Sequence, residues 1–123
     1  MRCLIVDDSA DFVDAARHLL EHGGIAVVGM ASTSAAALRC FEEQRPDVTL
    51  VDINLGSESG FELAELLHRS GLPAPSPVIL ISTDAEEDFA DMIASSPAIG
   101  FLAKFALTPG AIRDLVGGPP GLA

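Results

Sequence analysis

The sequence has little positive charge. Its 123 residues include 7 Lys and Arg against 18 Asp and Glu, which gives a net charge of -11 at pH 7. Binding to nucleic-acid phosphates needs clustered Lys and Arg, so this composition argues against a nucleic-acid-binding surface. It favours a protein that binds a cation or a basic partner surface.

Paired cysteines and long apolar runs are also lacking. Cys3 and Cys40 are isolated, without C-x-x-C spacing, so we expect reduced packing residues in a cytoplasmic protein. The apolar run 3–6 is too short to span a bilayer, and two aspartates follow it at once. It does not resemble a signal peptide. The sequence therefore predicts neither a membrane span nor a disulfide framework.

What the sequence does contain is an alternation of apolar strands and amphipathic helices. Apolar residues make up 49% of a chain long enough for one domain with its own core. We expect buried strands at residues 2–6, 25–30, 47–51, 78–81 and 99–103. We expect helices to begin near residues 10, 34, 59, 84 and 108. Residues 71–77 are predicted to be a loop, residues 1–117 one domain, and residues 118–123 a Gly/Pro-rich tail or linker.

Helix caps and apolar stripes give this interpretation its detail. Predicted N-caps are Ser9, Ser34, Ser59 (in a capping box with Glu62), Asp84 with Glu87, and Thr108 before Pro109. The residues expected to face the core are Phe12, Ala16, Leu19, Leu20, Leu38, Phe41, Leu63, Leu66, Leu67, Phe89, Met92, Ile93, Ile112, Leu115 and Val116.

Five βα units predict an α/β fold with a parallel sheet covered by helices on both faces. At this length the expected topology is doubly wound and flavodoxin-like, with strand order 2-1-3-4-5. Such a sheet has a crevice where strands 1 and 3 diverge, at the carboxyl ends of the strands.

Polar residues follow four of the five strands. Asp7 and Asp8 follow strand 1, Asp52 strand 3, Ser82 strand 4 and Lys104 strand 5, so the topology brings all five to one edge of the sheet. Each alone has an ordinary explanation as a turn, cap or solvated residue. Together, three neighbouring carboxylates repel one another, and a divalent cation is the simplest way to stabilise them.

Oxygen ligands without His or Cys favour Mg²⁺, with Mn²⁺ as an alternative ion. A hydroxyl and a lysine on the other side would complete a site for a phosphoryl group. Asp52 lies centrally and would be the nucleophile that forms an acyl phosphate, while Asp7 and Asp8 would hold the metal.

The sequence resembles the receiver domain of two-component response regulators over about residues 2–117. The segments that carry the resemblance are Leu-Ile-Val-Asp7-Asp8, Pro-Asp-Val-Thr-Leu-Val-Asp52-Ile-Asn-Leu, Ser-Gly60-Phe-Glu-Leu, Pro-Val-Ile-Leu-Ile-Ser82 and Gly-Phe101-Leu-Ala-Lys104. The resemblance implies that Asp52 accepts a phosphoryl group from a histidine kinase or phosphotransfer protein. It implies hydrogen bonding of that group by Ser82 and pairing with Lys104. The implied Mg²⁺ ligands are Asp7, Asp8, Asp52 and the main-chain carbonyl of Asn54.

The resemblance also implies a switch. Ser82 would move toward the phosphoryl oxygens, Phe101 would turn inward, and the surface of helix 4, strand 5 and helix 5 would change for a downstream protein or output domain. Phe101 has an equal alternative as an ordinary core aromatic. Two residues depart from the usual pattern: Phe105 follows the lysine in place of proline, and Thr83 replaces a small residue.

The residues expected to set the lifetime of the phosphoryl group are Asn54, Thr83 and Asp84.

Two other functions remain open at this point. A Mg²⁺-dependent aspartyl-phosphate phosphatase uses a similar set of residues, and a receiver-like interaction module would use the fold without phosphorylation. We expect a receiver, either stand-alone or severed from an output domain, that is not an enzyme beyond its own phosphorylation and dephosphorylation. We expect it to be a monomer or a weak phosphorylation-dependent dimer, without nucleic-acid or membrane binding.

Overall fold

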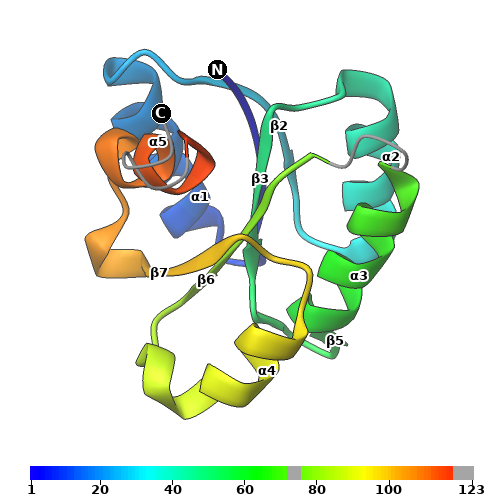
Figure 1. Ribbon diagram of the computed structural model, residues 1–123. Coiled ribbons are helices and arrows are strands. Elements are labelled where there is room, and N and C mark those ends of the chain that lie inside the picture. The colour runs from blue at the N-terminus through cyan, green and yellow to red at the C-terminus, as the bar shows by residue number, and fades with distance from the viewer. Residues whose placement is uncertain (72–75, 118–123) are drawn as a thin grey trace.

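The computed structural model describes residues 1–71 and 76–117. At its centre is a five-stranded parallel sheet with the order β2-β1-β3-β6-β7, which confirms the predicted topology (Figure 1). Its strands are β1 (Arg2–Val6), β2 (Ala26–Ala31), β3 (Val48–Asp52), β6 (Val78–Ser82) and β7 (Gly100–Ala103). A small antiparallel pair, β4 (Asn54–Leu55) with β5 (Glu58–Ser59), was not predicted.

Helices cover both faces of the sheet, with α1 and α5 on one face and α2 and α3 on the other (Figure 1). The helices are α1 (Ala10–His22), α2 (Ser34–Gln44), α3 (Gly60–Ser70), α4 (Ala90–Ser95) and α5 (Pro109–Gly117). Two short 3-10 turns are η1 (Glu86–Phe89) and η2 (Lys104–Ala106). Within the described residues no helix is long and apolar enough to cross a membrane. The predicted tail 118–123 and residues 72–75 of the predicted loop lie outside the described residues.

Successive residues of the strands point to opposite faces of the sheet and pack into two separate cores. Leu4 and Val6 of β1 point into the core under α2 and α3, where Phe41 and Leu63 pack. The other β1 residues, Cys3 and Ile5, point into the core under α1 and α5. That second core contains the buried side chains Val13, Ala16 and Leu20 of α1 and Ile112 of α5. Because β1, β3 and β6 are buried on both faces, they have the continuous apolar runs that the sequence predicted.

The expectation that the second strand is buried is wrong. Only Ala31 of β2 is buried, because β2 lies at the edge of the sheet and pairs only with β1. Three residues predicted to face the core are exposed instead: Leu19 is 45% exposed, Leu66 38% and Met92 53%. In α1 the predicted Ala16 and Leu20 are buried, but the stripe also includes Val13 and leaves out Leu19, because the sheet selects this face of the helix.

The caps are partly as predicted. Ser9 and Thr108 accept hydrogen bonds from Phe12 N at 3.3 Å and Ala111 N at 3.0 Å, which confirms both. For α2 the prediction is off by one residue, because Thr33 is the cap and accepts from Ala36 N at 3.2 Å.

Of the other two cap predictions, the one at Ser59 is right in position only, and the one at Asp84 with Glu87 is wrong. Ser59 is the N-cap of α3, but it makes no side-chain cap, so the predicted capping box is absent. Instead Gly60 N donates to Ile53 O at 2.9 Å. Neither Asp84 nor Glu87 caps a helix, since η1 follows Ala85 and α4 begins only at Ala90.

Candidate functional site

The parallel sheet brings the predicted polar residues to one edge. Asp7 directly follows β1, Asp52 ends β3, Ser82 ends β6 and Lys104 directly follows β7. Pairing of Asp52 with Ile81 and of Ser82 with Ala103 sets these strand ends level with one another. The site is therefore a direct result of strand register.

Three carboxylates converge there. Oxygen atoms of Asp7, Asp8 and Asp52 all lie within 4.8 Å of one another. Asp7 and Asp52 are buried, at 2% and 5% exposure, whereas Asp8 is exposed. Main-chain amides hold the two buried carboxylates in place: Ser9 N donates to Asp7 Oδ1 at 2.8 Å and Asn54 N to Asp52 Oδ1 at 3.0 Å.

Lys104 neutralises part of this charge. Its Nζ lies 2.6 Å from Asp7 Oδ2 and 3.1 Å from Asp52 Oδ2. Burial opposes the charge on Lys104, but the two carboxylates outweigh it and raise the pKa of the lysine. Burial also raises the pKa of Asp52, with a smaller contribution from Asp7, although the bonds from Asn54 N and Lys104 oppose the shift. Lys104 therefore does not fully offset the cost of burying the ionised Asp52 carboxylate.

The carboxylate cluster fits a hard divalent cation. Asp7 Oδ2 is buried and contacts Lys104 Nζ at 2.6 Å, and a carboxylate oxygen has a further lone pair with which it could bind a metal. All three side-chain donors are carboxylate oxygens, which Mg²⁺ and Mn²⁺ prefer. Asn54 lies in β4 immediately beyond Asp52, and its chain segment turns at Gly56, whose φ is 66°.

The predicted switch residues lie on the other side of Asp52. Ser82 is 3% exposed, and its Oγ accepts a hydrogen bond from Asp84 N at 3.0 Å. Phe101 is 9% exposed and already packs in the core under α2 and α3. The predicted rate-tuning residues Asn54, Thr83 and Asp84 are all exposed at or near this edge.

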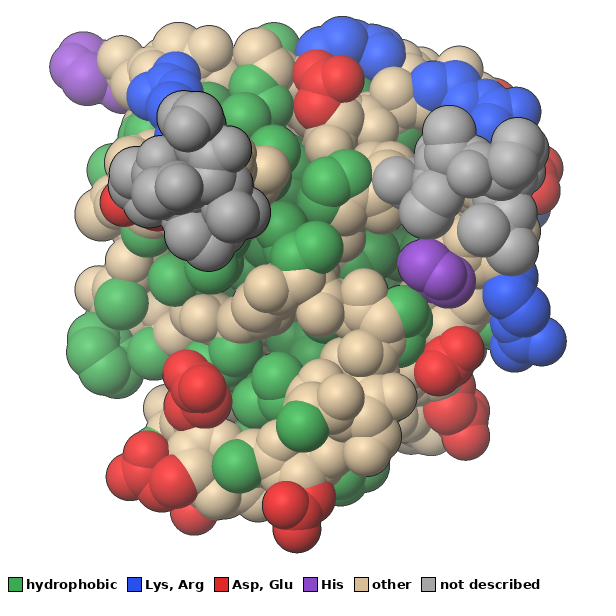
Figure 2. Space-filling view, viewed as in Figure 1, with side chains coloured by type: hydrophobic (Ala, Val, Ile, Leu, Met, Phe, Trp, Pro, Cys, Tyr) green, Lys and Arg blue, Asp and Glu red, His purple; other side chains and the backbone are tan. Residues whose placement is uncertain are grey.

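A groove of about 470 Å³ runs beside Ser82 and Lys104. Its lining residues are Thr83, Ala85, Glu86, Glu87, Phe101, Leu102, Ala103, Phe105 and Ala106. Phe105 is 88% exposed, which is unusual for an aromatic side chain. Asp and Glu side chains gather in the lower part of Figure 2, where α4 lies in Figure 1, while the Lys and Arg in view lie above or to the right. The groove thus combines apolar area with an acidic wall.

Sequence reasoning missed two residues that contact this region. The ring centroid of Phe12 lies 4.5 Å from Lys104 Nζ. The carboxylate of Glu58 accepts a hydrogen bond from Ser34 N at 2.9 Å, which ties the segment after Asp52 to the start of α2. Phe12 had been assigned to the core stripe of α1, and its position in the first turn after the Asp pair was the available signal.

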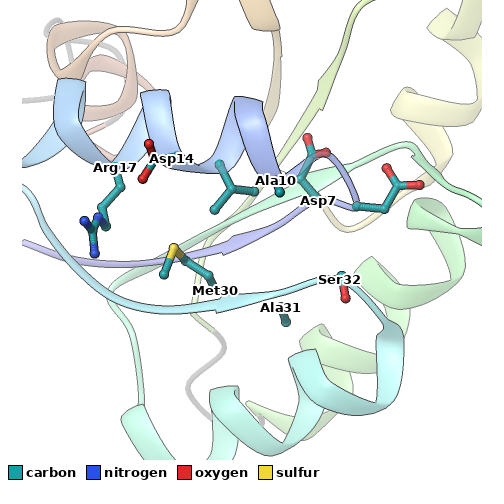
Figure 3. Close-up of a pocket in the computed structure, with 9 residues that line it drawn as sticks. Asp7, Ala10, Asp14, Arg17, Met30, Ala31 and Ser32 are labelled. Carbon is teal, nitrogen blue, oxygen red and sulfur yellow. The ribbon is translucent and has the colours of Figure 1, made fainter.

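A second hollow, of about 580 Å³, lies between α1 and β2 (Figure 3). Asp7 lies at one end of it, and Arg17 and Met30 at the other. It opens onto the same carboxylates and so extends the acidic site rather than forming another.

A flavodoxin-like sheet with an acidic cluster and a lysine at the carboxyl ends of its strands is the arrangement found in signal-receiving domains. The family model described as the response regulator receiver domain matches residues 3–116. Because the match covers nearly the whole chain, the chain belongs to the response regulator receiver domain family of two-component systems.

Solved structures agree with this chain in fold. The signal receiver domain of the response regulator NarL from Mycobacterium tuberculosis superimposes with a TM-score of 0.83 and is 30% identical, over 96% of this chain and 97% of that one. A response regulator from Burkholderia pseudomallei, described with a phosphorylated aspartic acid and a calcium ion, has a TM-score of 0.79 at 25% identity. That similarity covers 93% of this chain and 65% of the other.

Curated relatives include much longer proteins. A protein-glutamate methylesterase/protein-glutamine glutaminase of Hahella chejuensis is 37% identical over 82 residues, which are 67% of this chain. One of Halobacterium salinarum is 32% identical over 116 residues, or 94% of this chain. The chain spans only 23% and 32% of those two proteins.

Proposed function

We propose that the chain is a phosphorylation-activated receiver in which Asp52 accepts a phosphoryl group from a histidine kinase or phosphotransfer protein. The observation that carries the proposal is the position of the Asp52 carboxylate. Lys104 approaches it at 3.1 Å, and oxygens of Asp7 and Asp8 lie within 4.8 Å. A nucleophile placed between a cation and metal-ligating carboxylates is suited to phosphoryl transfer, since that reaction depends on charge stabilisation.

In the transfer, a carboxylate oxygen of Asp52 attacks the phosphorus of a phosphohistidine. The new P–O bond forms as the P–N bond breaks, and the leaving imidazole keeps the electron pair and takes up a proton from solvent. Asp52 becomes an acyl phosphate. The chain is modified in this reaction and turns over no separate substrate, so we do not propose that it is an enzyme in the usual sense.

Asp7, Asp8, Asp52 and the main-chain carbonyl of Asn54 would hold Mg²⁺, with Mn²⁺ as the alternative. Such an ion supplies positive charge next to the phosphoryl oxygens. The calcium ion and phosphorylated aspartic acid of the Burkholderia pseudomallei relative support this assignment.

Lys104 and Ser82 would complete the phosphoryl site. Lys104 would exchange its contact with Asp52 Oδ2 for a phosphoryl oxygen. The Ser82 hydroxyl would donate a hydrogen bond to a second phosphoryl oxygen, because its Oγ already accepts one from Asp84 N.

The downstream contact would use the groove beside Ser82. Phosphorylation adds about -1.5 to -2 charge, which would draw Ser82 toward the site and let the buried ring of Phe101 repack behind it. The exposed ring of Phe105 and the acidic wall formed with Glu86 and Glu87 suit a partner segment that combines basic and apolar side chains.

The wider setting belongs to the same proposal. We place the exchange in the cytoplasm, in keeping with the free thiols of Cys3 and Cys40. Residues 1–117 would form the receiver, as a monomer or a weak phosphorylation-dependent dimer. Residues 118–123 would form its tail or linker.

Incubation with acetyl phosphate and Mg²⁺, followed by intact mass, tests the assignment. Wild type should gain the mass of one phosphoryl group in an alkali-labile, acid-stable form, and Asp52→Asn should not. Asp14→Asn is the matched control, because the Asp14 side chain is 71% exposed, and should label like wild type. Labelling of Asp52→Asn would refute the site. Turnover of a small phosphomonoester would favour a phosphatase, and absence of any acyl phosphate would favour an interaction module.

A further inference from the structure

Lys104 is the only lysine of the chain, and the proposed transfer needs its ammonium close to Asp52. Its own backbone does little to hold it there. Lys104 begins the short turn η2, which Leu107 N closes on Lys104 O at 3.3 Å. The next residue, Phe105, is 88% exposed, so its side chain contributes little to holding the turn in place. Contacts along the side chain must therefore keep the ammonium in place.

The ring of Phe12 supplies such a contact from the first turn of α1. Lys104 Nζ lies 4.5 Å from its centroid, in the range where the ring quadrupole attracts a cation. This attraction is stronger where water is excluded, and the Lys104 side chain is only 13% exposed. The ring and the two buried carboxylates, Asp7 and Asp52, together enclose the ammonium.

Phe12 is itself tied to the acidic site through the cap of α1. Asp7 Oδ1 accepts from Ser9 N at 2.8 Å, and Ser9 Oγ accepts from Phe12 N at 3.3 Å. The other oxygen of the same carboxylate, Asp7 Oδ2, contacts Lys104 Nζ at 2.6 Å. The carboxylate that pairs with the lysine therefore also places the ring that faces it.

We propose that Phe12 is a positioning residue for Lys104, a role that rests on the proposed phosphorylation of Asp52. During the transfer Lys104 exchanges Asp52 Oδ2 for a phosphoryl oxygen, and the ring keeps the ammonium at the site through that exchange. Contact with the ring face needs no particular N–H bond, so the three donors of the ammonium stay available for oxygens. Leucine would fill much of the same space but would not attract the charge.

The single lysine makes the contact directly observable. In the metal-free full chain, ¹³C-labelled lysine gives one ε-methylene signal by NMR. The Phe12 ring should shift this signal upfield, Phe12→Leu should remove most of the shift, and Phe12→Tyr should keep it. Phe61→Leu is the matched control, because it removes a half-buried ring that packs on Phe89 at 6.2 Å, and should leave the signal unchanged. Persistence of the shift in Phe12→Leu would overturn the contact.

The effect of Phe12 on phosphorylation is measured as the rate at which acetyl phosphate labels Asp52 at saturating Mg²⁺. Phe12→Leu should slow labelling roughly 3- to 10-fold, Phe12→Tyr should restore it, and the Mg²⁺ concentration for half-saturation should not change in either variant. Equal rates in Phe12→Leu and wild type, or no rescue by Phe12→Tyr, would overturn the positioning role. Phe12→Met provides a second apolar variant if leucine impairs folding. Failure of wild type to label at Asp52 would refute the proposed function instead, while the NMR comparison would still test the ring contact.

Discussion

Replacement of Gly60 by alanine should disturb the fold and the acidic site together. A Cβ at Gly60 would lie 2.0 Å from the main-chain oxygen of Asp52, and 2.8 Å from both Asp52 C and Ile53 Cα. All three atoms belong to the backbone at the end of β3, so no side-chain rotation relieves the overlap. Gly60 does not have a positive φ, and the cost of the substitution is therefore steric.

The size of the effect follows from these distances. Ordinary contact begins near 3.4 Å, so the β3 end and α3 must separate by about 1.4 Å. Overpacking of this kind typically costs about 1–3 kcal/mol. The movement also weakens the hydrogen bond from Gly60 N to Ile53 O, which contributes roughly 1 kcal/mol. We expect a loss of about 3 kcal/mol, which corresponds to a fall in Tm of roughly 10 °C for a domain of this size.

Urea unfolding followed by circular dichroism measures the loss, since the chain has no Trp or Tyr for fluorescence. Gly110→Ala in the first turn of α5 is the matched control: its new Cβ would meet nothing closer than Thr108 Oγ1 at 4.0 Å. That substitution should stabilise the protein by up to about 1 kcal/mol. Where Gly60→Ala is still folded, displacement of Asp52 should also slow its phosphorylation, by as much as about 10²-fold for 1 Å. Equal stability of the two variants would refute the steric reasoning.

Three further predictions concern other parts of the chain. A Cβ at Gly29 would lie 2.1 Å from Cys40 Sγ. Gly29→Ala should therefore lower the free energy of unfolding by about 1–3 kcal/mol in the wild-type background but by little in a Cys40→Ala background. Additive losses in this double-mutant cycle would contradict the reasoning. Burial raises the pKa of Asp52 above its ordinary 3.8, so the stability linked to this group is full below that value and is lost as the pH rises through the folded pKa. Asp52→Asn should therefore raise the urea midpoint of the metal-free protein at pH 7 but not at pH 3.5, and a gain that persists in acid would argue against this cause. Thr83→Ala should shorten the lifetime of the phosphorylated protein, because the β-branched side chain restricts the approach of water; equal or slower decay at saturating Mg²⁺ would exclude that effect.

The topology was predictable because the same short sequence pattern marks each strand and helix. Each central strand is a continuous apolar run that ends on a polar residue, and only one common topology at this length brings those ends together. The five polar residues of the site follow from that topology, and Asp7, Asp52 and Lys104 meet within a few ångströms as expected.

Details that depend on contacts between distant segments were not predictable. Helical spacing predicted Leu19 in the buried stripe of α1, but packing on the sheet buries Val13 and leaves Leu19 exposed. Phe12 packs against the core, as its pattern predicts, but its ring also lies beside Lys104, a residue 92 positions later in the chain. The contact of Glu58 with Ser34 likewise joins β5 to the start of α2, two segments that are close only in the folded chain.

The division of the core between the two faces has a consequence for folding during synthesis. The core under α2 and α3 draws its helical residues from Ala37, Phe41, Leu63, Ala64 and Leu67, which are made early. The core on the other face pairs α1, the first helix made, with Leu107 and Ile112 near the end of the described chain. At about 5–20 residues per second, the 90 residues between His22 and Ile112 take roughly 5–20 s to emerge from a ribosome. Throughout that interval the apolar face of α1 lacks its final cover, so we expect chaperones to bind this face in the nascent chain.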